Sequence, residues 1–297
     1  MPRISVLIPT HDHGPLLRCA YQSLVQQTEQ DFELFIICDG ATAETTNTAE
    51  DIAASDTRVY VHHYPKSPRT GEAYRHEVIT KHARGDFIFY LSDDDLWMPD
   101  HLQKLCQSLN ETDFVSSQYA CIYVTPDNHI ESPAVDLGLT YYKKLLQGTV
   151  NRISLSAVAH RRTAYLTLPH GWRTTPAGIY TDHYMWQQWL SQKGLRFGSL
   201  LVPTVINFPS PLRKEMTLTM REQELSLWLE QMRSDEELAK LSDFLNEGVV
   251  RSLTAQAAHL EENVTSYQSQ ISKLVKERKR LMVRIANRLH RSLFGDS

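Results

Sequence analysis

Short apolar runs alternate with amphipathic stretches over the first 91 residues, and this alternation limits the fold more than any other feature. The runs are rich in β-branched and aromatic residues, as buried strands are, and they lie at residues 4–9, 32–38, 58–62 and 86–91. Apolar residues with a near-helical period fill the segments between them, at residues 16–27, 42–54 and 71–82. Strands that alternate with helices predict βαβ units. We therefore expect an α/β fold with a mostly parallel, Rossmann-like sheet flanked by helices.

Polar residues follow three of the expected strands. They form the segments His11-Asp12-His13, Asp39-Gly40 and Asp93-Asp94-Asp95. Ligands of parallel α/β sheets bind beyond the carboxyl ends of the strands, so we expect these segments at one edge of the sheet. Adjacent carboxylates repel one another unless a cation lies among them, and carboxylate oxygens are preferred ligands of Mg²⁺ and Mn²⁺. The acidic run is therefore a candidate divalent-metal site. The alternative is a solvated loop that caps the helix expected near Pro99.

Four motifs occur in a fixed order along this part of the chain. They are Ile4-Ser-Val-Leu-Ile-Pro-Thr10, Cys38-Asp39-Gly40, Gly71-Glu-Ala-Tyr-Arg75-His76 and Ala83-Arg-Gly85-Asp-Phe-Ile-Phe-Tyr-Leu-Ser-Asp93-Asp94-Asp95. Each motif alone is weak, but the ordered set is specific. Together they resemble the donor-binding half of the family 2 glycosyltransferases, closely over residues 3–110 and more weakly to about residue 215. The resemblance implies the GT-A fold and the transfer of a sugar, with inversion, from a nucleotide diphosphate donor to an acceptor hydroxyl. A UDP-sugar is the expected donor.

The resemblance assigns roles to the residues that match the family's motifs. Pro9 and Thr10 stand where the family lines the nucleotide pocket. Asp39 stands where the family accepts a hydrogen bond from the base, commonly uracil, although an Asp-Gly pair also forms ordinary turns. Arg75 stands in the helix that faces the donor, where a guanidinium could pair with phosphate or orient the aspartates. The alternative for Arg75 is a position on the helix surface.

The acidic run matches the family's DXD motif. Asp94 matches the final aspartate, which is the expected ligand of Mn²⁺ or Mg²⁺. Asp93 and Asp95 flank it and could serve the ribose or a water-mediated metal contact, and we assign Asp93 to the donor and Asp95 to the metal. Ser92 departs from the family because it stands at the motif's first acidic position.

Two further departures concern histidines. The segment His11-Asp12-His13 replaces the family's more usual Tyr-Asn pairing after the first strand. His11 and His13 could ligate a metal, although neighbouring histidines on a loop are more often merely polar. His76 stands where the family usually has Asn, and it still supplies a hydrogen-bonding group.

Sugar transfer also requires a base that takes the proton of the acceptor hydroxyl. The family's base opens a helix in the second half of the domain, and Thr181-Asp182-His183 matches that position. Thr181 replaces the common Glu, which leaves Asp182 as the candidate catalytic base and His183 as a weaker second. The alternative is that Asp182 only caps the helix, where the helix dipole favours a carboxylate.

Aromatic and basic residues near this segment suggest further contacts. Trp172, Trp186 and Trp189 cluster there, and we expect one of them, Trp172 in first place, to stack on a sugar ring. Core packing is the commoner use of tryptophan. Arg213 follows the last strand-like segment and is expected to approach the diphosphate.

The chain changes character from Arg221 onward, where a long, charged helical pattern without proline begins. Apolar residues at alternating steps of three and four run from Val250 to Leu274 and resume at Leu281 and Ile285. This heptad pattern predicts a coiled coil or a long docked helix. Residues 273–291 carry eight Lys or Arg against one acid, with Leu289 on the apolar face, and such a helix suits an anionic membrane surface. The pattern is compatible with a homo-oligomer and with a peripheral membrane contact.

Composition limits the other function classes. The four cysteines, Cys19, Cys38, Cys106 and Cys121, are widely spaced, which argues against a disulfide framework or a zinc site. No 18-residue apolar stretch predicts a membrane span, and no leader pattern opens the chain. We expect a cytoplasmic chain, at or near the inner face of the membrane. The net charge of −4 is too small to indicate a partner, and we expect no nucleic-acid partner for the basic tail because the rest of the chain is acidic.

We expect a GT-A domain at residues 1–215, with the donor half at 1–100 and the acceptor half at 101–215. Residues 216–297 would form a helical extension. The acceptor would be a saccharide or a lipid-linked saccharide in glycan assembly. A sugar-nucleotide nucleotidyltransferase is a second candidate, but the Gly-rich phosphate loop expected after the first strand is absent. A non-catalytic coiled-coil protein with a degenerate transferase domain is a third, and Ser92 and Thr181 favour it.

Overall fold

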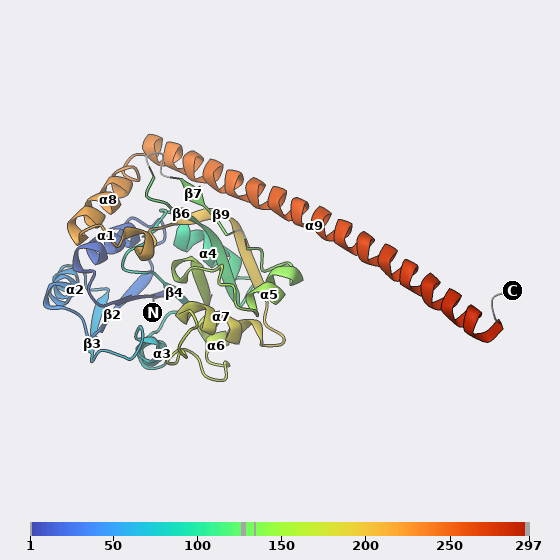
Figure 1. Ribbon diagram of the computed structural model, residues 1–297. Helices are drawn as coiled ribbons and strands as arrows, with labels where there is room; N and C mark the ends of the chain where they lie inside the picture. Colours follow the sequence, from blue (N-terminus) through green and yellow to red (C-terminus); the bar gives the residue numbers. More distant parts are fainter. Residues whose placement is uncertain (1, 126–128, 134, 295–297) are drawn as a thin grey trace. The chain divides into compact units, whose positions relative to one another are not determined.

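The computed structural model describes residues 2–125, 129–133 and 135–294, and side chains as far as residue 285. The chain divides into two units, one ending at Val250 and one beginning at Arg251, and each is described by itself. Figure 1 shows the elements in chain order. They are β1 (Ile4–Thr10), α1 (Gly14–Val25), β2 (Phe32–Asp39), α2 (Ala43–Ser55), β3 (Val59–Tyr64), α3 (Glu72–Lys81), β4 (Phe87–Tyr90), β5 (Leu96–Trp97), α4 (His101–Leu109), β6 (Phe114–Ile122), β7 (Ile130–Glu131), α5 (Thr140–Leu146), η1 (Leu155–Ala157), β8 (Val158–Arg161), α6 (Arg162–Tyr165), α7 (Thr181–Leu190), β9 (Phe197–Asn207), η2 (Ser210–Arg213), α8 (Leu218–Glu230) and α9 (Asp235–Phe294).

The described strands form one mixed sheet in the order β3-β2-β1-β4-β8-β6-β9-β5, with β7 paired to β6. The first four neighbours, β3, β2, β1 and β4, run parallel to one another. Strand β8 is antiparallel to both β4 and β6, and β6 is parallel to β9. The α/β fold expected from the alternating pattern is confirmed, and the sheet is parallel in its first half and mixed in its second.

Helices cover both faces of the parallel half of the sheet (Figure 1). Successive side chains of a strand point to opposite faces. Accordingly, Val6 and Ile8 of β1 pack in the core shared with α1 and α4, whereas Leu7 packs in a second core shared with α3 and α7. Strand β1 is buried between β2 and β4, which explains why its sequence is a continuous apolar run. Burial on both faces fixes the strand ends that carry the site.

A third core joins helix α8 and the start of α9 to the sheet. Trp228 and Leu229 of α8 and Leu241 and Leu245 of α9 are buried there with Phe208, which follows β9. The first compact unit therefore reaches Val250, beyond the boundary expected at residue 215. The charged helical pattern from Arg221 onward did not reveal this packing, because the apolar faces of docked and unpartnered helices look alike in sequence.

The second unit consists of the later part of α9, which continues to Phe294. The apolar side chains of its heptad pattern are exposed to solvent, from Leu260 through Tyr267 to Ile285. The side chains of Leu289 and Arg291, which belong to the expected basic amphipathic end, lie outside the described residues. None of the helices in the described chain combines the length and the apolar character needed to cross a membrane.

Candidate active site

His13, Asp93 and Asp94 form a compact group at the carboxyl ends of β1 and β4. One potential ligand atom from each residue lies within 4.8 Å of the others. His13 Nδ1 lies 3.0 Å from Asp93 Oδ1. The two strands are parallel neighbours, so the segments that follow them meet at one edge of the sheet, as the sequence predicted. Two carboxylates and an imidazole suit a divalent first-row cation such as Mn²⁺. The residues present therefore fit the metal that the sequence motif implies.

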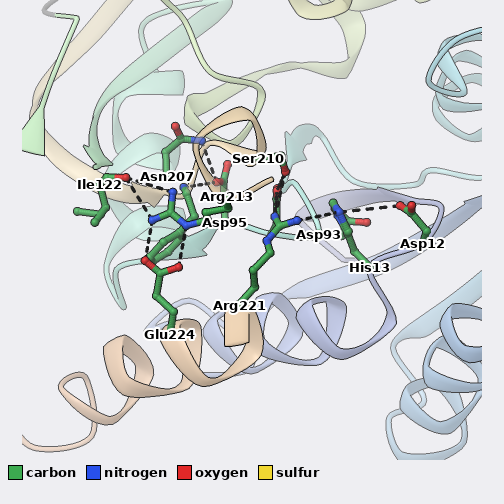
Figure 2. A network of polar contacts seen from close by, with 12 residues as sticks. Asp12, His13, Asp93, Asp95, Ile122, Asn207, Ser210, Arg213, Arg221 and Glu224 are labelled. Carbon is green, nitrogen blue, oxygen red and sulfur yellow. Dashed lines mark hydrogen bonds and ion pairs between the residues drawn. The ribbon is translucent and has the colours of Figure 1, made fainter. Parts of the chain in front are cut away.

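Asp94 is held by groups from the segment after β9. Figure 2 shows Arg221 of α8 and Ser210 of η2 converging on the acidic group. Ser210 donates its hydroxyl proton to Asp94 Oδ2 at 2.7 Å, and Arg221 Nη2 lies 2.8 Å from the same oxygen. Arg221 Nη1 also lies 3.2 Å from His13 Nε2. Burial raises the pKa of Asp94, and the neighbouring charge of Asp93 raises it further.

Asp95 lies beside this group but is bonded within the protein. Its Oδ1 accepts hydrogen bonds from Asn207 Nδ2 at 2.8 Å and from the Phe208 amide at 3.2 Å. Its Oδ2 accepts the Ser156 hydroxyl at 2.6 Å. Burial, followed by the charge of Asp94, raises the pKa of Asp95 to about 7. With both oxygens engaged, Asp95 fastens the acidic loop to β9 and η1, and the metal-ligand role expected for it stays untested.

Asp39 ends β2, the other neighbour of β1, and both of its carboxylate oxygens accept hydrogen bonds. Its Oδ2 accepts hydrogen bonds from Lys66 Nζ at 2.6 Å and from the Ser67 hydroxyl at 2.9 Å. The Ser67 amide donates to Oδ1. Burial alone would raise the pKa of Asp39, but the hydrogen bonds from Lys66 and Ser67 outweigh it and lower the pKa. Asp39 is therefore an ionised acceptor at the carboxyl edge of the sheet.

Two residues expected in the nucleotide pocket lie at the end of β1. Pro9 is partly buried. Thr10 is 4% exposed, and its hydroxyl has no hydrogen-bond partner among the described residues. A buried hydroxyl without a partner is costly unless a ligand or water supplies one.

Arg75 is buried in α3, not on the helix surface. Its Nη2 donates to the Thr70 carbonyl at 2.7 Å, and its guanidinium carbon lies 4.9 Å from the centre of the Trp172 ring. Within the described chain, Nε and Nη1 have no hydrogen-bond partner, and no carboxylate forms an ion pair with the group. Burial lowers the pKa of Arg75. A buried guanidinium with unused donors suits an anionic ligand.

Asp182 is the second residue of α7. Its Oδ1 accepts hydrogen bonds from Asn151 Nδ2 at 2.9 Å and from the His183 amide at 2.8 Å. Burial raises the pKa of Asp182, although these two bonds and the charge of Arg75 oppose the rise. His183 is buried, and its ring nitrogen lies 2.7 Å from the Leu146 carbonyl. Of the two residues, Asp182 is the one suited to accept a proton.

The structure links Asp182 to the donor side of the site. The Thr70 hydroxyl donates to the Thr181 hydroxyl at 3.3 Å, and Thr181 in turn donates to Glu72 of α3 at 3.4 Å. Burial is the main cause that raises the pKa of Tyr119 in β6, and the charges of Asp182 and Asp95 raise it further. The charges of Asp95 and Asp182 therefore both reach the Tyr119 hydroxyl.

The expectation of a sugar-stacking tryptophan is wrong. Trp172 is 2% exposed, and Trp186 and Trp189 are fully buried in the core between the sheet and α7. The Trp172 ring nitrogen donates to the Tyr90 hydroxyl at 2.9 Å. An indole ring enclosed on both faces by protein cannot stack on a sugar.

The expectation that Arg213 approaches the diphosphate is also wrong. Arg213 is buried, and two of its nitrogens bond to Glu224 at 2.7 and 2.6 Å (Figure 2). It also donates to the Ile122 carbonyl. Arg221, eight residues further along, is the arginine that reaches the acidic group. Sequence reasoning missed it, because both arginines follow β9 and only the packing of α8 decides which one faces the site.

The two histidines of the loop after β1 separate in the structure. His13 joins the acidic group, whereas His11 lies outside the three-residue metal group. The third histidine that departs from the family, His76 of α3, has its ring Nδ1 2.8 Å from the Tyr165 hydroxyl. The imidazole that fits the metal is therefore His13.

Comparison with known proteins relates this geometry to a family. The model of the family described as glycosyl transferase family 2 matches residues 5–165. The putative glycosyltransferase EpsH of Bacillus subtilis is 30% identical over 166 residues, which cover 54% of this chain and 47% of that protein. A Campylobacter jejuni protein described as GalNAc(5)-diNAcBac-PP-undecaprenol beta-1,3-glucosyltransferase is 27% identical over 114 residues, covering 37% of this chain and 36% of that protein. The chain thus spans less than half the length of these relatives.

Solved structures share the fold at low sequence identity. S. aureus TarS 1-349 in complex with UDP-GlcNAc aligns with a TM-score of 0.53 at 14% identity, covering 78% of this chain and 67% of that one. The mannosyltransferase PcManGT from Pyrobaculum calidifontis, in complex with GDP-Man and Mn²⁺, aligns with a TM-score of 0.50 at 16% identity. That alignment covers 86% of this chain and 75% of the other. The neighbours support the GT-A fold.

Proposed function

Because this chain belongs to glycosyltransferase family 2, we propose that it transfers a sugar from a nucleotide diphosphate donor, a UDP-sugar in first place, to an acceptor hydroxyl. The observation that carries the proposal is the convergence of Asp39, His13 and the acidic pair Asp93 and Asp94 at the ends of adjacent strands. Asp39 supplies a hydrogen-bond acceptor for the nucleobase of the donor, and the other three residues supply ligands for a metal. Asp182 supplies the base that the transfer needs.

The donor would lie along the carboxyl edge of the sheet. Its base would bind near Asp39, Pro9 and Thr10, and its ribose near Asp93. Arg75 has two unused donors for an anionic group of the donor. His13 and Asp94 would hold Mn²⁺ or Mg²⁺ together with Asp93, and Asp95 would orient the loop through its bonds to Asn207 and Ser156. A bound metal would neutralise charge that develops on the leaving diphosphate.

Asp182 would act as the general base. Its carboxylate takes the proton of the acceptor hydroxyl while the acceptor oxygen bonds to the anomeric carbon and the bond from that carbon to the diphosphate breaks. The nucleoside diphosphate leaves with the electron pair of the broken bond. One displacement opposite the leaving group inverts the anomeric centre. A pKa raised by burial improves a carboxylate as a base near neutral pH.

We propose a saccharide or lipid-linked acceptor in polysaccharide assembly. The support is the Campylobacter relative, whose description names an undecaprenol-linked saccharide. The exposed apolar residues of α9 and the basic sequence after residue 273 would serve a homo-oligomer or a contact with the inner face of an anionic membrane.

Release of nucleoside diphosphate tests the proposal. The protein is incubated with UDP-glucose, UDP-GlcNAc, UDP-galactose or GDP-mannose in the presence of Mn²⁺ and a saccharide acceptor. We expect release with one donor, and a loss of roughly 10³-fold in kcat when Asp182→Asn removes the base. Asp94→Ala should also abolish release. The matched control is Asp86→Asn, which makes the same change at an exposed position before β4, at the opposite edge of the sheet.

Other outcomes identify the alternatives. Pyrophosphate formed from a sugar phosphate and a nucleoside triphosphate would indicate a nucleotidyltransferase. An absence of binding to every donor would favour the non-catalytic interaction protein. Full activity of Asp182→Asn would reject Asp182 as the base.

A further inference from the structure

Arg221 occupies a place at Asp94 that a divalent cation would need. Its Nη2 lies 2.8 Å from Asp94 Oδ2, and its Nη1 lies 3.2 Å from His13 Nε2. Two of the three residues that could hold a metal are therefore already in contact with one guanidinium. Figure 2 shows the side chain of Arg221 reaching His13.

The surrounding residues hold the Arg221 side chain in place. The side chain is only 7% exposed, and Ser210 bridges it to Asp94, accepting from Arg221 Nη2 at 2.9 Å. The helix that carries it is fixed at its start by Thr217, whose hydroxyl accepts the Met220 amide, and further along by Trp228 in the third core. Buried ion pairs of this kind exist only where the geometry compensates for the lost hydration. Arg221 is therefore a buried member of the acidic group and not a surface arginine.

The charges explain what the contact does. Asp93 and Asp94 repel each other, and burial makes the ionised form of Asp94 more costly still. A nearby positive charge relieves both effects. A divalent ion that binds the same oxygens must either share them with the guanidinium, at a repulsive cost, or displace it.

We propose that Arg221 is a tethered cation that competes with the divalent metal for Asp94, so that metal entry requires the guanidinium to leave this carboxylate. The inference rests on the metal site of the function proposed above. Once released, the guanidinium remains attached to α8 beside the site, and its planar, two-pronged donors suit a phosphate group. The exchange would couple metal binding to donor binding.

Direct Mn²⁺ binding to the full chain, measured by electron paramagnetic resonance and calorimetry without any nucleotide, tests the competition. Arg221→Met keeps the length of the side chain and removes its charge, and we expect Mn²⁺ to bind roughly tenfold more tightly. Arg221→Lys keeps the charge but cannot contact Asp94 and His13 together, so its affinity should fall between the two. Arg233→Met is the matched control, because it removes the same charge from an exposed arginine bonded to Glu230. Its affinity should equal that of the unaltered chain.

Unchanged or weaker Mn²⁺ binding in the Arg221 variants would overturn the proposal, as would an absence of Mn²⁺ binding in all of them. Circular dichroism establishes that each variant is folded, and if Arg221→Met does not fold, the affinity of Arg221→Lys decides. Because no donor is present, the result is independent of sugar transfer. A chain that shows the competition but releases no nucleoside diphosphate would contradict the proposed function alone.

Discussion

Asp182 owes its acid–base character to two opposing influences. Burial raises its pKa above that of an ordinary aspartate, whereas hydrogen bonds to the ionised carboxylate and the charge of Arg75 lower it. A general base works only when it is deprotonated, so the rate of transfer should fall at low pH, as Asp182 takes up a proton. The pKa of Asp182 therefore sets the acid limb of the pH profile.

Asn151→Ala tests this assignment. The Asn151 amide donates to Asp182 Oδ1 at 2.9 Å and favours the ionised form. Its removal should raise the pKa of Asp182 and move the acid limb of kcat/KM to higher pH by about 0.5–1 unit. The measurement is kcat/KM for nucleoside diphosphate release between pH 5 and pH 9, a range chosen around roughly neutral pH. Gln147→Ala is the control, since Gln147 bonds to the Leu190 carbonyl and not to Asp182. An acid limb that stays in place would mean that another group titrates.

At the residue scale the sequence located some site residues and misjudged others for a physical reason. The position of the acidic run follows from strand periodicity, because strand ends of a parallel sheet share one edge. By contrast, the partner of Asp94 is Arg221, which lies 127 positions away along the chain, and the Trp172 ring is enclosed by residues of several elements. Long-range packing decides both the partner of Asp94 and the burial of Trp172, and a local sequence pattern carries no information about such packing.

At the scale of elements, helix α8 connects the third core to the site. Trp228 lies with its ring centre 6.1 Å from that of Phe208 and 6.2 Å from that of Phe244, and it is 5% exposed. Arg221 extends from the same helix to Asp94. Loss of packing under α8 should therefore affect both the stability of the fold and the acidic group.

We expect Trp228→Ala to lower the free energy of unfolding by about 3–5 kcal/mol, because it opens a cavity in this core. Leu227→Ala is a control on the same helix, since Leu227 is 64% exposed and its truncation should change stability by only about 0.5 kcal/mol. Urea denaturation followed by circular dichroism measures both. Equal effects of the two substitutions would contradict the packing of α8.

The elements differ in how far their sequence determines them. The strands and helices up to residue 91 follow from alternation and period, and the structure has them within a few residues of the expected positions. Buried polar contacts inside those elements do not follow from period. Glu33 lies in the fully buried strand β2 because Arg84 Nε and Nη2 and the Ser5 hydroxyl bond to its carboxylate. Such pairs form only when the fold brings distant segments together.

At the scale of the whole molecule, the candidate site lies within one of the two units. The unit that ends at Val250 contains every residue placed at the candidate site. In the second unit, Val264 and Ile271 alternate with Leu260 and Leu274 along one seam of α9, and these side chains are 54–63% exposed. β-branched residues at one seam position with leucine at the other favour a two-stranded, parallel coiled coil. The same exposure would be expected of a helix that lies on a membrane, so the seam needs a direct test.

Charge introduced into the seam separates the two possibilities. If a second copy covers the seam, the chain should be a dimer by light scattering, and the double substitution Leu260→Lys and Leu274→Lys should make it a monomer. Ser269→Lys with Val283→Lys adds the same two charges away from the seam, at heptad positions that face solvent in a two-stranded coil, and should leave the dimer intact. A membrane-bound helix responds differently, because added lysines off its apolar face strengthen binding to anionic vesicles. A monomeric unaltered chain would reject the coiled coil. Its sedimentation with anionic vesicles would then assign the exposed seam to the membrane.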